Sequence, residues 1–167
     1  MNEKLGWYLT GFADGEGSFN ISMRRRESGS GWQLDPSFNV SQRDVTVLHL
    51  FKRYLHCGTI RYRRDGVAYY EVRSLAALHE IVIPFFTRFR LLSASKKKNF
   101  SLFKQAIERM WNNEHSSQEG LRSILEIREK LNEGRGRKRK YTIKDLSTNK
   151  GILRDYTSDS DSRLEMI

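Results

Sequence analysis

Four segments of the chain alternate between apolar and polar side chains, and this alternation constrains the fold more than any other feature. Because successive side chains of a strand point to opposite faces, each segment predicts a strand with one apolar and one polar face. Asp65-Gly66, a favoured hairpin turn, joins the last two. The four segments are residues 18–26, 33–41, 58–64 and 67–73. Together they predict an antiparallel sheet.

Helical periodicity in the intervening segments predicts five helices. The first carries an apolar stripe of Leu5, Tyr8, Leu9 and Phe12 and is ended by the glycines that follow. The helices are expected at residues 3–13, 44–55 and 75–83, from Ser95 onward, and at 117–132, with Pro84 ending the third. The order α-β-β-α-β-β-α-α-α indicates an α+β fold with helices on one face of the sheet.

The charge balance indicates a polyanionic partner. The chain carries 30 Lys and Arg against 20 Asp and Glu, a formal net charge of +10. Hydrophobic residues make up 38% of the chain, enough for a packed core, yet no apolar run approaches the ~18 residues that span a bilayer. The single cysteine, Cys57, excludes a disulfide framework. We expect a soluble intracellular protein that binds nucleic acid and no membrane.

The polar face of the predicted sheet is rich in arginine and amides. One interpretation is an ordinary solvated face. The other is a surface that reads base edges, because Arg pairs bidentately with guanine and Asn or Gln with adenine. The second interpretation predicts double-stranded DNA as a partner, bound through Asn20, Ser22, Arg24, Arg26, Gln33, Asp35, Ser37, Asn39, Arg61, Arg63, Tyr69, Glu71 and Arg73.

Two carboxylates follow the first predicted helix, at the end where carboxylates are unfavourable. Carbonyl groups point out of a helix C-terminus, so Asp14 and Glu16 cost roughly 0.3–1 kcal/mol each there. One explanation is that Asp14 bonds loop amides and Glu16 is merely exposed. The other is a cation that seeks oxygen ligands: Mg²⁺, or another divalent ion such as Mn²⁺ or Ca²⁺.

Gly11 and Gly15 lie one turn apart, opposite the apolar stripe of the first helix. A glycine in a helix costs up to ~1 kcal/mol relative to alanine. A C-cap role would account for Gly15 but not for Gly11. Small residues one turn apart let a second helix approach closely. Because the chain holds one copy of this segment, we expect a homodimer with Trp7, Gly11 and Gly15 at its interface.

One segment resembles the LAGLIDADG motif of homing endonucleases: Leu9-Thr10-Gly11-Phe12-Ala13-Asp14-Gly15-Glu16-Gly17. The resemblance implies the α-β-β-α-β-β-α fold of that family over roughly residues 3–132, with a saddle-like sheet that binds DNA. We interpret residues 1–140 as the endonuclease domain and residues 141–167, where the chain turns polar and slightly acidic, as a tail. The resemblance also implies a metal-dependent homodimer that breaks both strands of a long, nearly palindromic site and promotes intron homing.

Two further matches to this family imply site residues. Residues 39–44 resemble the stretch where a Gln lies near the scissile phosphate, which places that role on Gln42. Residues 91–100 resemble the stretch that holds a catalytic Lys, and spacing to Phe100 selects Lys96 over Lys97 and Lys98. Glu16 and the Gly15 carbonyl would then hold metal. Without the resemblance, Gln42 and Lys96 are more typical of solvated side chains near helix ends.

The sequence departs from the family pattern at three positions. Glu16 replaces the usual Asp, Thr10 replaces a small Ala, and Thr46 stands where some dimeric members carry an Arg. Two alternative functions on the same scaffold stay open: an RNA maturase that assists intron splicing, and a DNA-binding regulator that does not cleave. The basic run at residues 135–140 is expected to add phosphate contacts.

Overall fold

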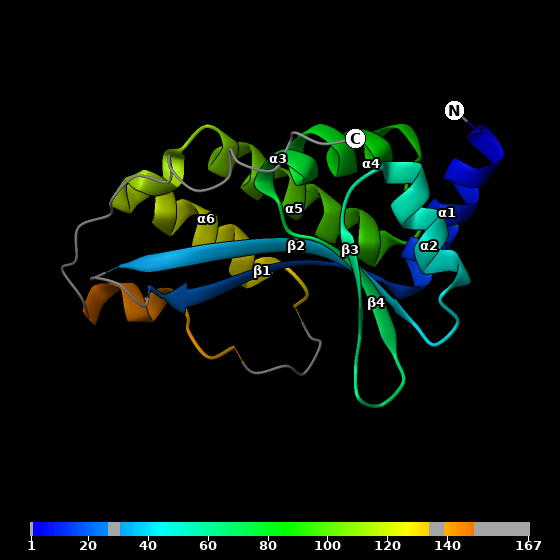
Figure 1. The fold of residues 1–167 in the computed structure, drawn as a ribbon. Helices are drawn as coiled ribbons and strands as arrows, with labels where there is room; N and C mark the ends of the chain where they lie inside the picture. Colours follow the sequence, from blue (N-terminus) through cyan, green and yellow to red (C-terminus); the bar gives the residue numbers. More distant parts are fainter. Residues whose placement is uncertain (1, 27–30, 134–138, 149–167) are drawn as a thin grey trace, which may run out of the picture.

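The computed structural model describes residues 2–26, 31–133 and 139–148, with four strands in one antiparallel sheet of order β1-β2-β4-β3. Helices cover one face of the sheet, and the β3–β4 hairpin extends beyond them (Figure 1). β1 pairs along most of β2, whereas β4 pairs only with the last five residues of β2. The strands are β1 Gly17–Arg25, β2 Trp32–Gln42, β3 Thr59–Tyr62 and β4 Ala68–Val72.

The helices confirm the predicted order and the α+β class. α3, η1 and α4 follow one another without a break and correspond to the third predicted helix. The helical elements are α1 Glu3–Glu16, α2 Thr46–Leu55, α3 Leu75–Ala77, η1 Leu78–Val82, α4 Ile83–Arg88, α5 Ala94–Trp111, η2 Glu114–Ser116, α6 Gln118–Lys130 and η3 Ile143–Thr148. Within the described ranges, no helix is long and apolar enough to cross a membrane.

The predicted apolar face of the sheet forms the core. Phe19 packs against Phe38, Phe86 and Phe103, joining β1 to β2, α4 and α5. Tyr62 differs: it shares the side of Ile60 but is 68% exposed, because the hairpin tip lies beyond the helical layer. Pro36 sits inside β2 opposite Ile21, in the half of the strand that pairs with β1 alone. A missing N–H is tolerated at such an edge.

The predicted apolar stripe of α1 is wrong in part. The buried residues of α1 are Gly6, Leu9, Thr10 and Ala13, and the predicted Leu5 and Phe12 pack partly buried against the core, whereas Tyr8 is 54% exposed. Gly6 sets this orientation, since a Cβ there would lie 2.4 Å from the ring of Phe89. Thr10 Oγ1 donates a hydrogen bond to the Phe89 carbonyl over 3.3 Å. The Thr10 hydroxyl therefore makes a hydrogen bond within the fold that an Ala at this position could not make.

The helix expected to end near Pro84 continues to Arg88. Proline cannot donate to the carbonyl four residues back, and its ring crowds that carbonyl. η1 is a π-turn in which the Ile83 amide donates to the Leu78 carbonyl, one residue further back than in an α-helix. This turn precedes Pro84 at the start of α4. Phe85, Phe86 and Phe89 beyond it are all buried, so the continued helix completes the core.

Three side chains of the helical layer bond to the free edge of β1. Lys96 Nζ donates to the Gly17 carbonyl, Asn132 Nδ2 to Phe19 O at 2.7 Å, and Arg128 Nε to Ile21 O at 2.9 Å. These carbonyls alternate along the strand and point away from β2. These side-chain donors replace hydrogen bonds that a fifth strand would make, and they satisfy the outward carbonyls of the β1 edge.

The segment after α6 packs back onto the domain. Arg139 donates to the Arg128 and Leu131 carbonyls at the end of α6, so this member of the basic run serves a helix C-terminus. Tyr141 contacts Trp32 with ring centroids 5.0 Å apart, and η3 lies against α6. The boundary at residue 141 stays a prediction, and residues 134–138 and 149–167 lie outside the described residues.

We predict that Arg128→Met lowers the free energy of unfolding by about 2–3 kcal/mol, because it leaves the Ile21 and Tyr141 carbonyls without their donor. Arg122→Met on the same helix is the matched control. Its exposed ion pair with Glu126 contributes no more than about 0.5 kcal/mol. Urea unfolding of both variants measures the difference, and equal losses would contradict the role assigned to Arg128.

Candidate nucleic-acid interface and active site

α1 passes directly into β1, with no loop between them. Gly17 caps α1 and is also the first residue of β1, where its extended backbone pairs with Val40. A Cβ at Gly17 would lie 2.6 Å from the Ala13 carbonyl oxygen, so glycine is required at this junction. The expected helix end at residue 13 is therefore wrong, since α1 includes Asp14, Gly15 and Glu16. Glu16 stands where the helix meets the sheet.

The Asp14 carboxylate binds a distant segment of the chain. Its oxygens accept from the Ser93 amide at 3.0 Å and the Ser93 hydroxyl at 2.9 Å. Ser93 precedes the first residue of α5, so the predicted cap at Ser95 is displaced by two residues. A carboxylate is favourable at a helix N-terminus, which offsets its position at the end of α1. Asp14 thus ties α1 to α5.

Glu16 has a different environment. Its side chain is exposed, and no hydrogen bond or ion pair joins it to any residue that the structure describes. The C-terminal carbonyls of α1 repel a carboxylate and attract a cation. Carboxylate and carbonyl oxygens are the ligands that Mg²⁺ prefers, so Glu16 and its helix end fit such an ion. No group of three or more His, Cys, Asp or Glu side chains in the described ranges is arranged to hold a metal.

The structure brings Gln42 and Lys96 to the same end of the sheet as Glu16. Gln42 lies two residues past Val40, the partner of Gly17, and its Oε1 accepts from the Arg43 amide at 2.8 Å. Lys96 is 3% exposed and reaches the Gly17 carbonyl, next to Glu16. Lys97 and Lys98 are exposed instead, and Lys98 pairs with Glu133 at 3.5 Å.

The predicted base-reading side chains align across the strands. Asp35 lies at the centre: Arg24 Nε approaches its carboxylate to 2.7 Å, Gln33 Nε2 to 3.2 Å and Arg73 Nη2 to 4.0 Å. Asp35 therefore orders neighbouring donors of the polar face. Cross-strand pairs continue the face across the sheet: Asn20 with Ser37, Ser22 with Asp35, Ser18 with Asn39, Asn39 with Glu71, Ser41 with Tyr69 and Arg61 with Tyr69.

Two of the residues predicted to read bases interact with residues away from the polar face of the sheet. Arg26 follows the end of β1 and acts on His115, in η2 on the helical side: burial and then the charge of Arg26 lower the pKa of that imidazole. Arg63 Nη2 pairs with Asp65 at 2.9 Å in the hairpin turn. The sequence prediction also missed Asn99, Arg128 and Asn132. A signal existed for Asn99, which lies four residues before Phe103 on the buried side of α5.

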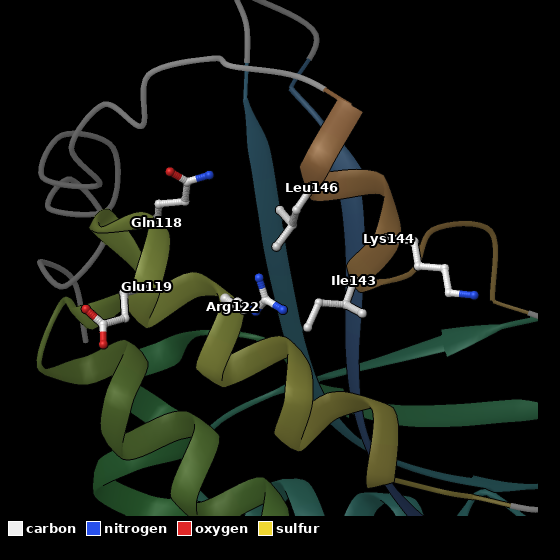
Figure 2. Close-up of a pocket in the computed structure, with 6 residues that line it drawn as sticks. All are labelled: Gln118, Glu119, Arg122, Ile143, Lys144 and Leu146. Atoms are coloured by element: carbon white, nitrogen blue, oxygen red, sulfur yellow. The ribbon is translucent and has the colours of Figure 1, made fainter.

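A pocket of about 480 Å³ opens between α6 and η3 (Figure 2). Its lining residues are Gln118, Glu119, Arg122, Ile143, Lys144 and Leu146. It lies by the N-terminal half of α6, whereas the C-terminal half reaches Ile21 through Arg128. None of these residues belongs to the predicted site.

We predict that Asp14→Asn and Glu16→Gln have opposite effects on stability. Asp14→Asn should lower the free energy of unfolding by about 1–2 kcal/mol, because a neutral amide replaces the charged acceptor of Ser93. Glu16→Gln should leave it unchanged or raise it by a few tenths of a kcal/mol, since it removes a carboxylate from a helix C-terminus. Urea denaturation of the two isosteric variants measures both changes in the free energy of unfolding. A stable Asp14→Asn protein would contradict the tie to α5.

Comparison with known proteins identifies the family. The LAGLIDADG endonuclease family model matches residues 9–107. A probable intron-encoded endonuclease 2 from Neurospora crassa is 32% identical over 76% of the chain, and the chain spans 29% of that protein's length. DNA endonuclease I-CeuI from Chlamydomonas moewusii is 32% identical over 77% of the chain and 63% of its own.

Solved structures agree with these matches. The homing endonuclease I-TnaI superimposes with a TM-score of 0.73 at 30% identity, covering 89% of this chain and 96% of its own. I-CeuI complexed with DNA superimposes with a TM-score of 0.75 at 29% identity, covering 81% of this chain and 70% of its own. The chain with the Glu16 helix end and the arginine- and amide-rich sheet belongs to the LAGLIDADG endonuclease family.

Proposed function

We propose that the chain is a site-specific DNA endonuclease that hydrolyses phosphodiester bonds with a divalent metal and promotes intron homing. One observation carries the proposal: an exposed carboxylate, Glu16, stands at the carbonyl end of a helix where that helix enters a polar sheet face. The carboxylate suits metal binding, and the face suits base edges. The I-CeuI structure bound to DNA supports the choice of DNA as partner.

Recognition is assigned to the polar face of β1, β2, β3 and β4. Two-stranded ribbons enter the major groove, where each base pair presents a distinct set of donors and acceptors. Arg24, Arg61 and Arg73 are exposed on this face and supply donors for guanine or phosphate. Asn20, Gln33 and Asn39 supply amides, which pair with adenine.

Catalysis is assigned to the end of the sheet around Glu16. Glu16 and the Gly15 carbonyl would hold Mg²⁺, which supplies charge neutralisation at the phosphate and a more acidic bound water. Gln42, half-buried at the end of β2, orients a water molecule. Lys96, beside the Gly17 carbonyl, supplies positive charge near the reacting phosphate.

A homodimer is proposed through the exposed face of α1. Trp7 and Tyr8 are 49% and 54% exposed, and a Cβ at Gly11 or Gly15 would meet no described residue within 4 Å. Contacts with the part of the chain that the structure describes therefore do not account for these glycines, although each costs about 1 kcal/mol in a helix. A second copy of α1 would fill the space and bring two Glu16 carboxylates to one metal-binding end. A two-fold dimer matches a nearly palindromic site.

We predict that Glu16→Gln abolishes cleavage while DNA binding persists. Wild-type protein is first used to select sites from random double-stranded DNA, and both proteins are then incubated with the selected duplex and Mg²⁺. The wild type should cut both strands, whereas the variant should bind within about threefold of wild-type affinity and leave the duplex intact. Nicking by the variant at more than a few per cent of the wild-type rate would overturn the role of Glu16.

The same experiment separates the alternatives. Binding without cleavage by the wild type would indicate a regulator. Preference for structured intron RNA over every selected duplex would indicate a maturase.

We predict that Gly11→Leu converts the dimer to a folded monomer and removes double-strand cleavage. The side chain would keep two α1 helices apart, whereas the buried face of Gly6, Leu9, Thr10 and Ala13 is untouched. Sedimentation velocity at micromolar concentration measures the state. Ser101→Leu, which adds the same side chain to the exposed surface of α5, is the control and should stay dimeric. A dimeric, active Gly11→Leu protein would refute this interface.

A further inference from the structure

The edge donors of β1 include one side chain that also reaches the polar face. Asn132 follows the end of α6, and its Nδ2 has two acceptors: the Phe19 carbonyl at 2.7 Å and Asn20 Oδ1 at 3.2 Å. Phe19 belongs to the core side of β1, and Asn20 to the side assigned to DNA. Asn132 thus joins the helical layer to a side chain of the recognition surface.

The orientation of the Asn132 amide is determined by backbone atoms. The Phe19 carbonyl can only accept, so the atom that faces it is Nδ2. The Asn132 backbone amide can only donate, and it donates to Asn99 Oδ1 at 3.1 Å. Asn99 Nδ2 then donates to Asn132 Oδ1 at 3.0 Å. Asn99 is 8% exposed, so this pair of bonds is largely shielded from water.

The fixed Asn132 amide sets the orientation of Asn20. Because Nδ2 of Asn132 donates, the facing atom of Asn20 must be Oδ1, and a flipped Asn20 amide would place two donors against each other. Asn20 Nδ2 donates to Ser18 Oγ at 3.0 Å. Among the residues that the structure describes, these bonds use one acceptor position and one donor of the Asn20 amide. One acceptor position and one donor are left, and an amide recognises adenine through one acceptor and one donor.

The backbone of Asn132 indicates that its place is specified. Its φ is +57°, in the left-handed region that favours glycine and that asparagine tolerates best among other residues. Hydrogen bonds to Phe19, Asn20 and Asn99 hold both the backbone and the side chain of Asn132 in place.

We propose that Asn132 is a positioning residue for sequence recognition: it orients the Asn20 amide so that Asn20 selects adenine at one position of each half-site. This inference rests on the proposed function. It predicts that the preference at one base pair depends on a residue that contacts no DNA.

The test compares base preferences selected from random double-stranded DNA. Wild-type protein should prefer adenine about tenfold at the position that Asn20→Ala relaxes. Asn132→Gly, which keeps the left-handed backbone, and Asn132→Asp, which replaces the donor with an acceptor, should reduce that preference to about twofold and leave other positions unchanged. Asn113→Gly is the matched control and should keep the full preference. Asn113 also has a left-handed φ, +58°, but it follows α5 and is not among the described hydrogen-bond partners of Asn20.

A double variant separates positioning from a general structural effect. Asn132→Gly should change nothing further in the Asn20→Ala background, because its effect passes through Asn20. Should Asn132→Gly fail to fold, Asn99→Ala removes the partner of the Asn132 amide and should relax the same position. An unchanged preference in the Asn132 or Asn99 variants, or losses at many positions, would overturn the proposal. Failure of the wild type to select any sequence would instead refute the proposed function.

Discussion

The free edge of β1 is the constraint on which the arrangement depends. An edge strand needs partners for its outward carbonyls, and in this chain side chains from α5 and from the end of α6 supply them. The donors Lys96, Arg128 and Asn132 therefore locate the helical layer along the strand as well as across it. Apolar contacts such as those of Phe19 hold the layers together, and the hydrogen bonds to alternate carbonyls of β1 add directional contacts at fixed positions along the strand.

The sheet, its two faces and the order of the elements were predictable from sequence. A period of two along four short segments assigns each side chain to a face, and a favoured turn pair joins the hairpin. The carbonyl end of α1 could be chosen as a candidate site from the sequence because Glu16 breaks an electrostatic rule that most helices obey. The prediction that Glu16, Gln42 and Lys96 share one site rested on the family resemblance.

The errors arise where tertiary contacts override local patterns. Tyr8 has the spacing of a buried residue, but the ring of Phe89 accepts only Gly6 and rotates α1 away from the periodic stripe. Pro84 is a local helix breaker, yet the burial of three phenylalanines beyond it favours a π-turn over an end. Asn132 carries no periodic signal at all. Its role depends on atoms more than a hundred residues away.

The junction without a loop between α1 and β1 has a consequence for how such a protein changes its target. Only Gly17, Ser18 and Phe19 separate Glu16 from Asn20, the first residue assigned to base reading, and Gly17 has no room for a side chain. Under the proposed activity, the distance between the bond that is cut and the first base that is read is built into the backbone. A residue inserted here would shift every base-reading side chain of β1 relative to the bond that is cut. New targets are therefore accessible by exchanging side chains along β1 and β2, while the offset between cutting and reading is inherited unchanged.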